Sequence, residues 1–418
     1  MSLRIGIVSL GCPRNLVDSE SIVSRLKEKN FQITELEKAD VVIVNTCAFI
    51  QEAKEESIDT ILGLIELKKK GLVKKIIVHG CLVERYKDEL VKHLGDIDAF
   101  VGRLELNGRF IVKHSLTPQH FAYVKISEGC GNLCSYCVIP KIKGKLHSRT
   151  RESIIEQVKL LDKNNTKEIN LVGQDITLYG VDCCSKPQLA ELIKDILKNT
   201  HNIRWIRLLY LNPGRISDEL IDLIAKEERI CKYIDIPIQH INNRILKLMN
   251  RNTTKSQIMS LIKKIRKRID NVYLRTSIIA GFPTETEKEF QELINFLKEV
   301  KFERLGAFVY SREEDTKAYS FKNQIHSRTK RARFGRIMSV QREIASKLNE
   351  SLLGKVKEVM IDEKDEAEKD LYLARLEQDA PEVDGTVYLK SKTKLLPGEF
   401  RKVKIIDTLE YDLVGELL

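Results

Sequence analysis

Three cysteines lie within eight residues of the chain, Cys130, Cys134 and Cys137, in the run EGCGNLCSYC. Thiolates are soft ligands, which select iron–sulfur clusters, zinc or copper(I) over hard cations. A structural zinc site takes four protein ligands, and a cubane cluster takes one thiolate for each of its irons. Three thiolates on one short loop therefore leave one iron open, where a substrate or cofactor can bind. The spacing predicts chemistry at this loop.

Two plainer interpretations of these cysteines compete with a cluster. A secreted disulfide framework does not fit, because nine cysteines in 418 residues are dilute and no hydrophobic signal segment opens the chain. A structural zinc site that takes His147 as its fourth ligand remains an alternative at this point.

A second set of cysteines follows three strand-like runs near the start of the chain. Apolar, β-branched runs separated by helix-compatible segments are typical of β-α-β units and a parallel sheet. Cys12, Cys47 and Cys81 each come two residues after the end of a run. The runs are Arg4–Leu10, Val41–Asn45 and Lys75–His79, and the clearest helical segments between them are Asp18–Asn30 and Gln51–Leu67.

Equivalent positions on neighbouring parallel strands lie close together, because such strands are about 4.8 Å apart. Open α/β sheets also bind their ligands at the carboxyl edge of the strands. One buried cysteine is common in a core, but three at equivalent positions are hard to explain by packing. We therefore expect Cys12, Cys47 and Cys81 to hold a second three-thiolate cluster, again with one open iron. The remaining cysteines are assigned structural roles: Cys183, Cys184 and Cys231.

The composition is that of an ordinary globular protein with two or three domains. The chain has 418 residues, of which 42% are hydrophobic and 31% charged. No apolar run approaches the roughly 20 residues that span a bilayer, so we expect no membrane segment. We expect a cytoplasmic protein, because thiols stay reduced and a cluster survives in that compartment. The net charge of +11 is weak evidence for a polyanionic partner such as RNA or the ribosome.

From residue 122 onward, six strand-like runs alternate with helical segments. Six β-α units are too many for a small ferredoxin-like domain and too few for a full eight-stranded barrel. The strand-like runs are Tyr123–Ser127, Glu168–Gly173, Trp205–Tyr210, Tyr233–Ile236, Val272–Ala280 and Leu305–Tyr310. The helical segments include Arg151–Lys163, Leu189–Lys198, Asp218–Lys226, Thr254–Ile269 and Thr286–Val300.

Polar residues follow several of these strands, at the edge where barrel enzymes carry their active groups. Gln174 and Asp175 follow the second strand, and Gln239 and His240 follow the fourth. Each is a candidate for binding a cofactor or substrate, and each is equally well explained as a helix cap. The corresponding places after the fifth and sixth strands hold Gly281 and Ser311.

Two arginines, Arg207 and Arg275, fall inside apolar strand-like runs. An unpaired charge in such a place is costly, so each arginine needs an anionic partner. That partner is either the carboxylate of a bound cofactor or a carboxylate within the barrel.

The first cysteine loop resembles the signature of the radical S-adenosylmethionine (SAM) enzymes, in which an aromatic residue, here Tyr136, precedes the third cysteine. The resemblance implies a [4Fe–4S] cluster whose open iron is chelated by the amino and carboxylate groups of SAM. It implies reductive cleavage of SAM to a 5′-deoxyadenosyl radical, with the hard chemistry carried by the cofactor. It also implies that the six β-α units form a partial (β/α)6 barrel. The expected cofactor-binding residues are then Tyr136, Gln174 and Gln239.

With the second cysteine set included, the whole chain resembles the radical SAM methylthiotransferases, which insert sulfur and a methyl group at an unactivated C–H bond. The resemblance implies two [4Fe–4S] clusters and SAM, with the open iron of the second cluster holding the sulfur. Both open irons would have to face a common cavity. The implied fold is an N-terminal three-layer parallel α/β domain (1–115), the partial barrel (116–350), and a small antiparallel β-barrel called TRAM, which recognises substrate (351–418).

The resemblance is strongest to the branch of this family that adds a methylthio group to the β carbon of an aspartate in the ribosomal protein uS12, at the decoding centre. Pro13 and Arg14 after Cys12 fit that branch, whereas the tRNA branch typically has glutamine and methionine there. Three longer phrases agree with the same branch: Trp205–Tyr210, Tyr310–Glu314 and Asp379–Gly385. The chain departs from the family at Lys143–Arg149, which is less rich in arginine, and at Thr284, where glycine is usual.

Charge supplies an independent argument about the substrate. Residues 355–418 carry 11 Lys and Arg against 16 Asp and Glu, a net charge of −5, whereas the rest of the chain carries 60 against 44, a net of +16. An RNA-binding module is expected to be basic, and an acidic module suits a basic ribosomal protein. We therefore expect a ribosomal protein as substrate. The resemblance to radical SAM enzymes implies in addition a reductant protein such as flavodoxin or ferredoxin as partner.

Two alternatives to this function stay open on the sequence. The first is a tRNA methylthiotransferase that acts on an adenosine next to the anticodon. The second belongs to another class of protein altogether, a non-catalytic metal-binding ribosome or RNA factor.

Overall fold

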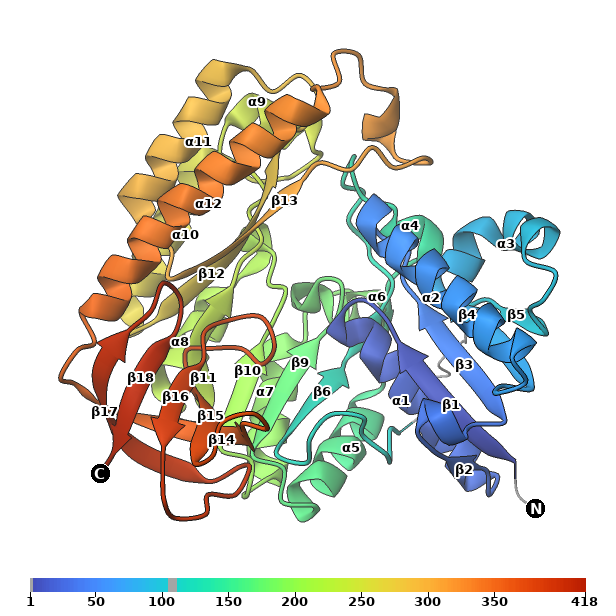
Figure 1. The fold of residues 1–418 in the computed structure, drawn as a ribbon. Coiled ribbons are helices and arrows are strands. Elements are labelled where there is room, and N and C mark those ends of the chain that lie inside the picture. The colour runs from blue at the N-terminus through green and yellow to red at the C-terminus, as the bar shows by residue number, and fades with distance from the viewer. Residues whose placement is uncertain (1–2, 104–110) are drawn as a thin grey trace.

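The computed structural model of the chain describes residues 3–103 and 111–418. Figure 1 shows an N-terminal parallel sheet, a six-stranded parallel sheet that forms a partial barrel, and a small closed β-barrel at the C-terminus. These three units confirm the expected fold class. Within the described residues, no helix is both long and apolar enough to cross a membrane. The predicted domain boundaries at 115/116 and 350/351 remain a prediction. Residues 1–2 and 104–110 of the predicted first domain lie outside the described part of the chain.

The N-terminal sheet is parallel, with the strand order β2-β1-β3-β4-β5. Alternate residues of its central strand pack on opposite faces: Val42 and Val44 join the cluster beneath α2 and α3, whereas Val41 and Ile43 join the cluster beneath α1. Helices therefore cover both faces, which gives three layers. The elements are β1 (Arg4–Ser9), α1 (Pro13–Glu28), β2 (Gln32–Ile33), η1 (Leu36–Lys38), β3 (Val41–Thr46), α2 (Gln51–Lys69), β4 (Lys75–Gly80), α3 (Cys81–His93) and β5 (Ala99–Val101).

The central sheet is parallel throughout, with the order β13-β12-β11-β10-β9-β6. Its strands are β6 (Phe121–Lys125), β9 (Glu168–Val172), β10 (Trp205–Leu208), β11 (Ile230–Asp235), β12 (Tyr273–Ala280) and β13 (Arg304–Val309). The major helices around it are α5 (Arg151–Lys163), α7 (Leu189–Asn199), α8 (Asp218–Lys226), α9 (Asn243–Leu248), α10 (Lys255–Arg268), α11 (Glu287–Val300) and α12 (Ser327–Glu350). All six predicted strands and all five predicted helices are present, with ends that differ by at most three residues.

The inner face of the central sheet is filled partly by its neighbours. Its aromatic residues Tyr123, Trp205 and Tyr233 form one buried cluster with Val17 of α1 and Met360 of the C-terminal barrel. The outer face is a separate and larger apolar cluster with the surrounding helices. The barrel interior is thus sealed by the two other units rather than by strands of its own.

The two arginines inside the strands pair with carboxylates of the protein. Arg207 donates to Glu168 at 2.8 Å, and both side chains have no exposed surface. Arg275 lies 3.3 Å from Asp235 and 3.4 Å from Asp384 of the C-terminal barrel. Of the two partners considered from the sequence, the structure therefore shows the ion pair.

The C-terminal unit is a closed five-stranded barrel, in the order β14-β15-β16-β18-β17. Its pair β16–β18 is parallel, and the other four pairs are antiparallel. Figure 1 shows this unit, in red, beside β10 and β11 of the central sheet. Its strands are β14 (Val356–Lys364), β15 (Leu371–Leu376), β16 (Val387–Lys390), β17 (Phe400–Thr408) and β18 (Leu413–Leu417).

Acidic residues of the C-terminal barrel bind this unit to the central barrel. Seven of its 16 acidic residues bind groups of the central unit, as does one of its 11 basic residues, Arg375, which pairs with Glu168 at 2.8 Å. The net charge of −5 therefore includes carboxylates that are already bound within the chain. The seven residues are Glu358, Asp362, Glu377, Asp379, Glu382, Asp384 and Glu410.

Thr284 adopts the backbone turn for which the family that the sequence resembles usually has glycine. Its φ is +69°, a left-handed conformation that costs a non-glycine residue about 1–3 kcal/mol. Arg244 holds it there, because its guanidinium donates to the Thr284 hydroxyl at 3.0 Å and to the Thr284 carbonyl at 2.8 Å. The substitution therefore leaves the turn after β12 intact.

Replacing Glu168 by alanine is expected to destabilise the seating of the C-terminal barrel by about 3–5 kcal/mol, because it leaves Arg207 and Arg375 buried without a shared partner. The chain's single tryptophan, Trp205, reports this interface, since its ring lies 5.0 Å from that of Phe400. Urea unfolding followed by tryptophan fluorescence measures the loss. The matched control is Glu358→Ala in the exposed pair with Arg204, worth at most about 1 kcal/mol; equal losses for both variants contradict the prediction.

Candidate active site

The second cysteine set lies at the carboxyl edge of the N-terminal sheet, where the sequence placed it. Cys12 caps the N-terminus of α1, Cys47 directly follows β3, and Cys81 is the first residue of α3. Cys47 and Cys81 are buried and Cys12 is half-buried. Helix N-termini carry a partial positive charge that favours thiolates, so two of the three positions are electrostatically suited to binding iron.

Close packing brings the three cysteine turns together. A Cβ on Gly11 would lie 2.7 Å from Cβ and 2.9 Å from Sγ of Cys47, so the turn before Cys12 rests directly on the Cys47 thiol. A Cβ on Gly80 would lie 2.7 Å from the carbonyl oxygen of Thr46. Both glycines have positive φ, +85° and +102°, which other residues rarely adopt. Cys12 and Cys81 are therefore each preceded by a glycine that the geometry requires.

Buried hydrogen bonds fix the same turns. The Asn15 amide donates to the Leu10 carbonyl at 2.7 Å, and the Asn45 amide donates to the Asn15 carbonyl at 2.8 Å. The hydroxyl of Ser57 accepts from the backbone amide of Cys47 at 3.0 Å and donates to its carbonyl at 2.9 Å. The positions of these thiols are thus set by the fold itself.

The thiol groups differ in their ease of ionisation. Burial raises the pKa of Cys81 to about 12 and also raises the pKa of Cys47. Burial acts in the same direction on Cys12, but the charge and hydrogen bond of Arg14, with help from Lys143, outweigh it and lower the pKa of Cys12. Cys12 is therefore the first ligand to ionise, and the buried pair must release protons when metal binds.

The first cysteine loop lies between β7 (Ser127–Glu128) and α4 (Ile139–Ile142), after β6. The backbone amide of Cys130 donates to the Gly144 carbonyl at 3.2 Å. Asp175 holds the loop from outside: it accepts from the Asn132 amide at 2.7 Å and from Arg215 at 3.0 Å. Arg215 also donates to the side-chain oxygen of Asn132 at 2.8 Å, so Asn132, Asp175 and Arg215 all bind one another.

The rest of this loop is held by apolar packing and one cation. The ring of Tyr136 packs against the buried cluster of Phe282 and Tyr310, and its hydroxyl is hydrogen-bonded to Cys134. Arg251 lies 4.0 Å from the Cys134 sulfur. Burial raises the pKa of Cys137 to about 12. Tyr136 thus supports the loop, and its expected contact with SAM stays a prediction.

The two glutamines predicted to bind the cofactor lie at the carboxyl edge of the central sheet. The side-chain oxygen of Gln174 is buried and, within the described residues, has no hydrogen-bond partner. Gln239 follows β11 with a φ of +69°, held by backbone bonds to Ser277 and Ile279 on β12. An unpaired buried oxygen and a strained backbone are both typical of functional sites. Neither observation identifies the ligand.

The other polar candidates have structural partners. Asp175 caps the 3-10 turn η2 (Ile176–Leu178) and binds the cysteine loop. His240 is fully buried, with Nε2 3.4 Å from Glu285, whose other oxygen accepts from the Gly281 amide at 2.7 Å. Ser311 accepts from the backbone of Gln51 in α2 at 3.2 Å. For these residues the structure shows capping and packing roles.

A buried set of four charged side chains joins the two cysteine-bearing edges. Asp18 of α1 pairs with both Lys125 and Lys143, the latter at 2.8 Å. Glu128 pairs with the same two lysines, at 2.6 Å and 3.7 Å. Asp18 follows Cys12 on its helix, while Glu128 and Lys143 flank the other cysteine loop. We call these residues the charge quartet.

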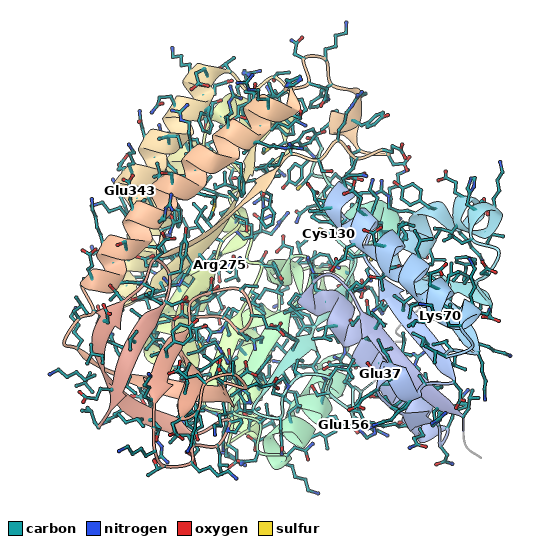
Figure 2. All side chains as sticks on the ribbon, in the orientation of Figure 1. Glu37, Lys70, Cys130, Glu156, Arg275 and Glu343 are labelled. Carbon is teal, nitrogen blue, oxygen red and sulfur yellow. The ribbon has the colours of Figure 1, made fainter. Side chains whose placement is uncertain are left out.

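Arg14 spans the same junction. Its guanidinium lies near the Cys12 thiol, whose pKa it lowers, and its charge also acts against the rise in the pKa of Cys137. It also lies 4.5 Å above the ring of Tyr210 and donates to the Gly173 carbonyl at 3.4 Å. In Figure 2, Cys130 is labelled at the border between the N-terminal sheet and the central barrel, and Arg275 within the barrel. The two cysteine sets therefore face one junction.

The donor atoms suit clusters better than a single ion. Within residues 3–103 and 111–418, no three His, Cys, Asp or Glu side chains are placed to hold one metal ion. A single zinc would draw its thiolates to within about 3.8 Å of one another, whereas a cubane gives each thiolate its own iron. His147 is exposed on the short strand β8 (His147–Ser148). The zinc alternative therefore gains no support.

The sequence analysis missed the residues that hold the loops. Arg215, Asn132 and Arg251 lie in segments without a periodic pattern, and the charge quartet spans 126 positions of the chain from Asp18 to Lys143. The three Gly-Cys pairs Gly11-Cys12, Gly80-Cys81 and Gly129-Cys130 gave a local signal, since glycine in a turn often marks positive φ, which all three glycines have. The remaining contacts depend on tertiary structure.

Three family models match the chain: the uncharacterized protein family UPF0004 over residues 4–102, the Radical SAM superfamily over residues 124–297 and the TRAM domain over residues 353–418. Among solved structures, the radical S-adenosylmethionine methyltransferase TsrM from Kitasatospora setae is similar, with a TM-score of 0.56 and 12% identity over 87% of this chain and 79% of that one. At that identity the likeness concerns the fold alone. The fold and the cysteine loop at its strand ends define a radical SAM enzyme.

Two relatives that are similar over nearly their full length define the family more specifically. The ribosomal protein uS12 methylthiotransferase RimO of Clostridioides difficile is 45% identical over 442 residues, which cover 100% of this chain and 99% of the relative. RimO of Caldicellulosiruptor saccharolyticus is 46% identical over 444 residues and the full length of both chains. The chain therefore belongs to the RimO family of radical SAM methylthiotransferases.

Replacing Gly11 by alanine is expected to prevent the second cysteine set from holding iron, because the added Cβ would meet the Cys47 thiol at 2.9 Å or less. After anaerobic reconstitution the variant should hold about half the iron and sulfide of the unaltered protein. The matched control is Gly63→Ala in α2, where nothing lies within 4 Å of the new Cβ. Full iron content in Gly11→Ala would refute the assignment of this turn.

Proposed function

We propose that this protein transfers a methylthio group to the β carbon of an aspartate in the ribosomal protein uS12, using SAM and two [4Fe–4S] clusters. The observation that carries the proposal is the junction at which the two cysteine sets meet, where Asp18, on the helix that Cys12 caps, pairs with Lys143 beside the other cysteine loop at 2.8 Å. Sulfur transfer to a carbon radical needs both centres at one substrate atom, since proximity makes the transfer effectively intramolecular.

Each cysteine set has its own part in this proposal. Cys130, Cys134 and Cys137 hold the cluster that binds SAM. A second cluster is held by Cys12, Cys47 and Cys81. When bound, the first supplies the electron that cleaves SAM and the second carries the sulfur that is transferred.

The chain's own residues orient these groups and exclude water. The charge quartet keeps the two loops adjacent, and the apolar packing of Tyr136 against Phe282 closes the far side of the first loop. We assign Tyr136, Gln174 and Gln239 to SAM contacts. The support for Gln174 is its buried, unpaired oxygen, an acceptor that suits an amino or hydroxyl group.

Several further expectations belong to the same proposal. The protein works in the cytoplasm, where thiols stay reduced, and receives its electrons from a reductant protein such as flavodoxin or ferredoxin. Its three domains comprise residues 1–115, 116–350 and 351–418, and the family-model matches fall inside these intervals.

A triple variant tests the division of labour. Cys12→Ala/Cys47→Ala/Cys81→Ala should retain about half the iron after anaerobic reconstitution, cleave SAM to 5′-deoxyadenosine with dithionite as reductant, and fail to modify a uS12 peptide. Liquid chromatography with mass spectrometry follows both products. The matched control is Cys183→Ala/Cys184→Ala, an exposed pair away from both loops, which should keep all the iron and the methylthio transfer. A triple variant that still transfers the methylthio group would refute the second cluster.

Mass spectrometry of uS12 and of total tRNA from a deletion strain decides the substrate. Loss of the methylthio group from uS12 supports the proposal. Its loss from tRNA, with uS12 unchanged, would establish the tRNA alternative. A reconstituted protein that produces no 5′-deoxyadenosine would point to a non-catalytic metal-binding factor.

A further inference from the structure

Arg14 crosses from the cysteine-bearing edge of the N-terminal sheet to the carboxyl edge of the central sheet. It lies in the first turn of α1, next to the Cys12 thiol, and crosses to the central sheet. There it donates to the carbonyl of Gly173, after β9, and stacks on Tyr210, after β10. It therefore lies where a substrate atom must be placed to meet both centres.

The charge of Arg14 is not balanced by a carboxylate in the described part of the chain. Its partners there are a thiol, a carbonyl and an aromatic ring. The neighbouring cations differ in this respect, since Lys143 is paired with Asp18 at 2.8 Å and Arg275 with Asp235 at 3.3 Å. Apart from the sulfur of Cys12, no protein anion pairs with this guanidinium in the described residues, so it can still bind a ligand carboxylate.

The chemistry of an aspartate side chain matches this position. The β carbon that must receive the radical and then the sulfur is bonded directly to the carboxylate carbon. A β carbon placed between Cys12 and Cys137 therefore brings its carboxylate within reach of the Arg14 guanidinium. An asparagine in the same place would offer one acceptor oxygen and no charge.

We propose that Arg14 binds the side-chain carboxylate of the substrate aspartate and selects aspartate over asparagine. This inference rests on the function proposed above, because it takes a protein aspartate as the substrate. Arg14 acts as a binding and positioning residue: its planar guanidinium, stacked on Tyr210, donates to both carboxylate oxygens and so fixes the orientation of the β carbon.

The stacking on Tyr210 explains why arginine suits this place better than lysine. The backbone of Tyr210 has a φ of +66°, and its amide donates to Asp235 at 2.9 Å, so the ring has a fixed position. A guanidinium has five N–H donors, so on such a ring it still has donors beyond the one that binds Gly173, whereas an ammonium is a point charge without a preferred plane. Lysine would keep the attraction and lose the two-pronged geometry.

The test measures binding as well as turnover. Two synthetic peptides of the uS12 target loop, one with the aspartate and one with asparagine in its place, are titrated into reconstituted holoenzyme with SAM, and Kd is measured by fluorescence anisotropy. The unaltered protein should bind the aspartate peptide about 10- to 100-fold more tightly, the range expected for hydrogen bonds between charged groups. Arg14→Gln should bind both peptides equally, and Arg14→Lys should keep part of the preference. Lys141→Gln, which removes an exposed charge from α4, should keep all of it.

The outcomes distinguish failure of the role proposed for Arg14 from failure of the proposed function. An Arg14→Gln protein that keeps its preference for the aspartate peptide, or that loses affinity for both peptides by the same factor, overturns the role of Arg14 and leaves the function intact. Loss of iron from Arg14→Gln, with the peptide preference unchanged, makes Arg14 a counter-charge of the cluster and also overturns it. If the unaltered holoenzyme modifies neither peptide and intact uS12 is unmodified too, the proposed function itself fails.

Discussion

The structure depends on the charge quartet, because these four side chains hold the two cysteine-bearing edges against each other. Asp18 comes from the helix that Cys12 caps, and Lys125 and Glu128 lead into the other cysteine loop. Breaking a buried pair by removing one partner typically costs about 3–5 kcal/mol, since it leaves an unpaired charge. The two sheets therefore cannot separate at this point without a large penalty, although each has its own core.

Ion pairs also make other contacts between the units. Glu313, after β13, pairs with Lys54 at 3.0 Å and with Arg85 at 2.8 Å, which ties the barrel to α2 and α3. The segment of residues 379–384 places Asp379 on Arg304 and Asp384 on Arg275 inside the barrel. Two of the sequence phrases that resembled the family's ribosomal branch are thus interface segments. Their residues bind other parts of this chain and so contribute to the assembly of the three units.

The sequence predicted best those features that depend on interactions between residues close together in the chain. The helices Arg151–Lys163 and Asp218–Lys226 were predicted to the residue, because Thr150 and Ser217 cap their first turns. The cysteine positions followed from strand ends alone. The use of the acidic C-terminal residues could not be predicted, because the partner of Asp379 lies 75 positions away, and net charge does not say which charges are already paired. The assignment to the RimO family therefore rests on the relatives and the site.

One chain of contacts connects the C-terminal barrel to the junction of the cysteine sets. Asp384 of that barrel pairs with Arg275, which pairs with Asp235 on β11. The other oxygen of Asp235 accepts from the amide of Tyr210, whose ring lies beneath Arg14. Each contact fixes the next, so seating the C-terminal barrel also sets the platform on which Arg14 lies. A unit that is placed away from the cysteines thereby contributes to the geometry between them.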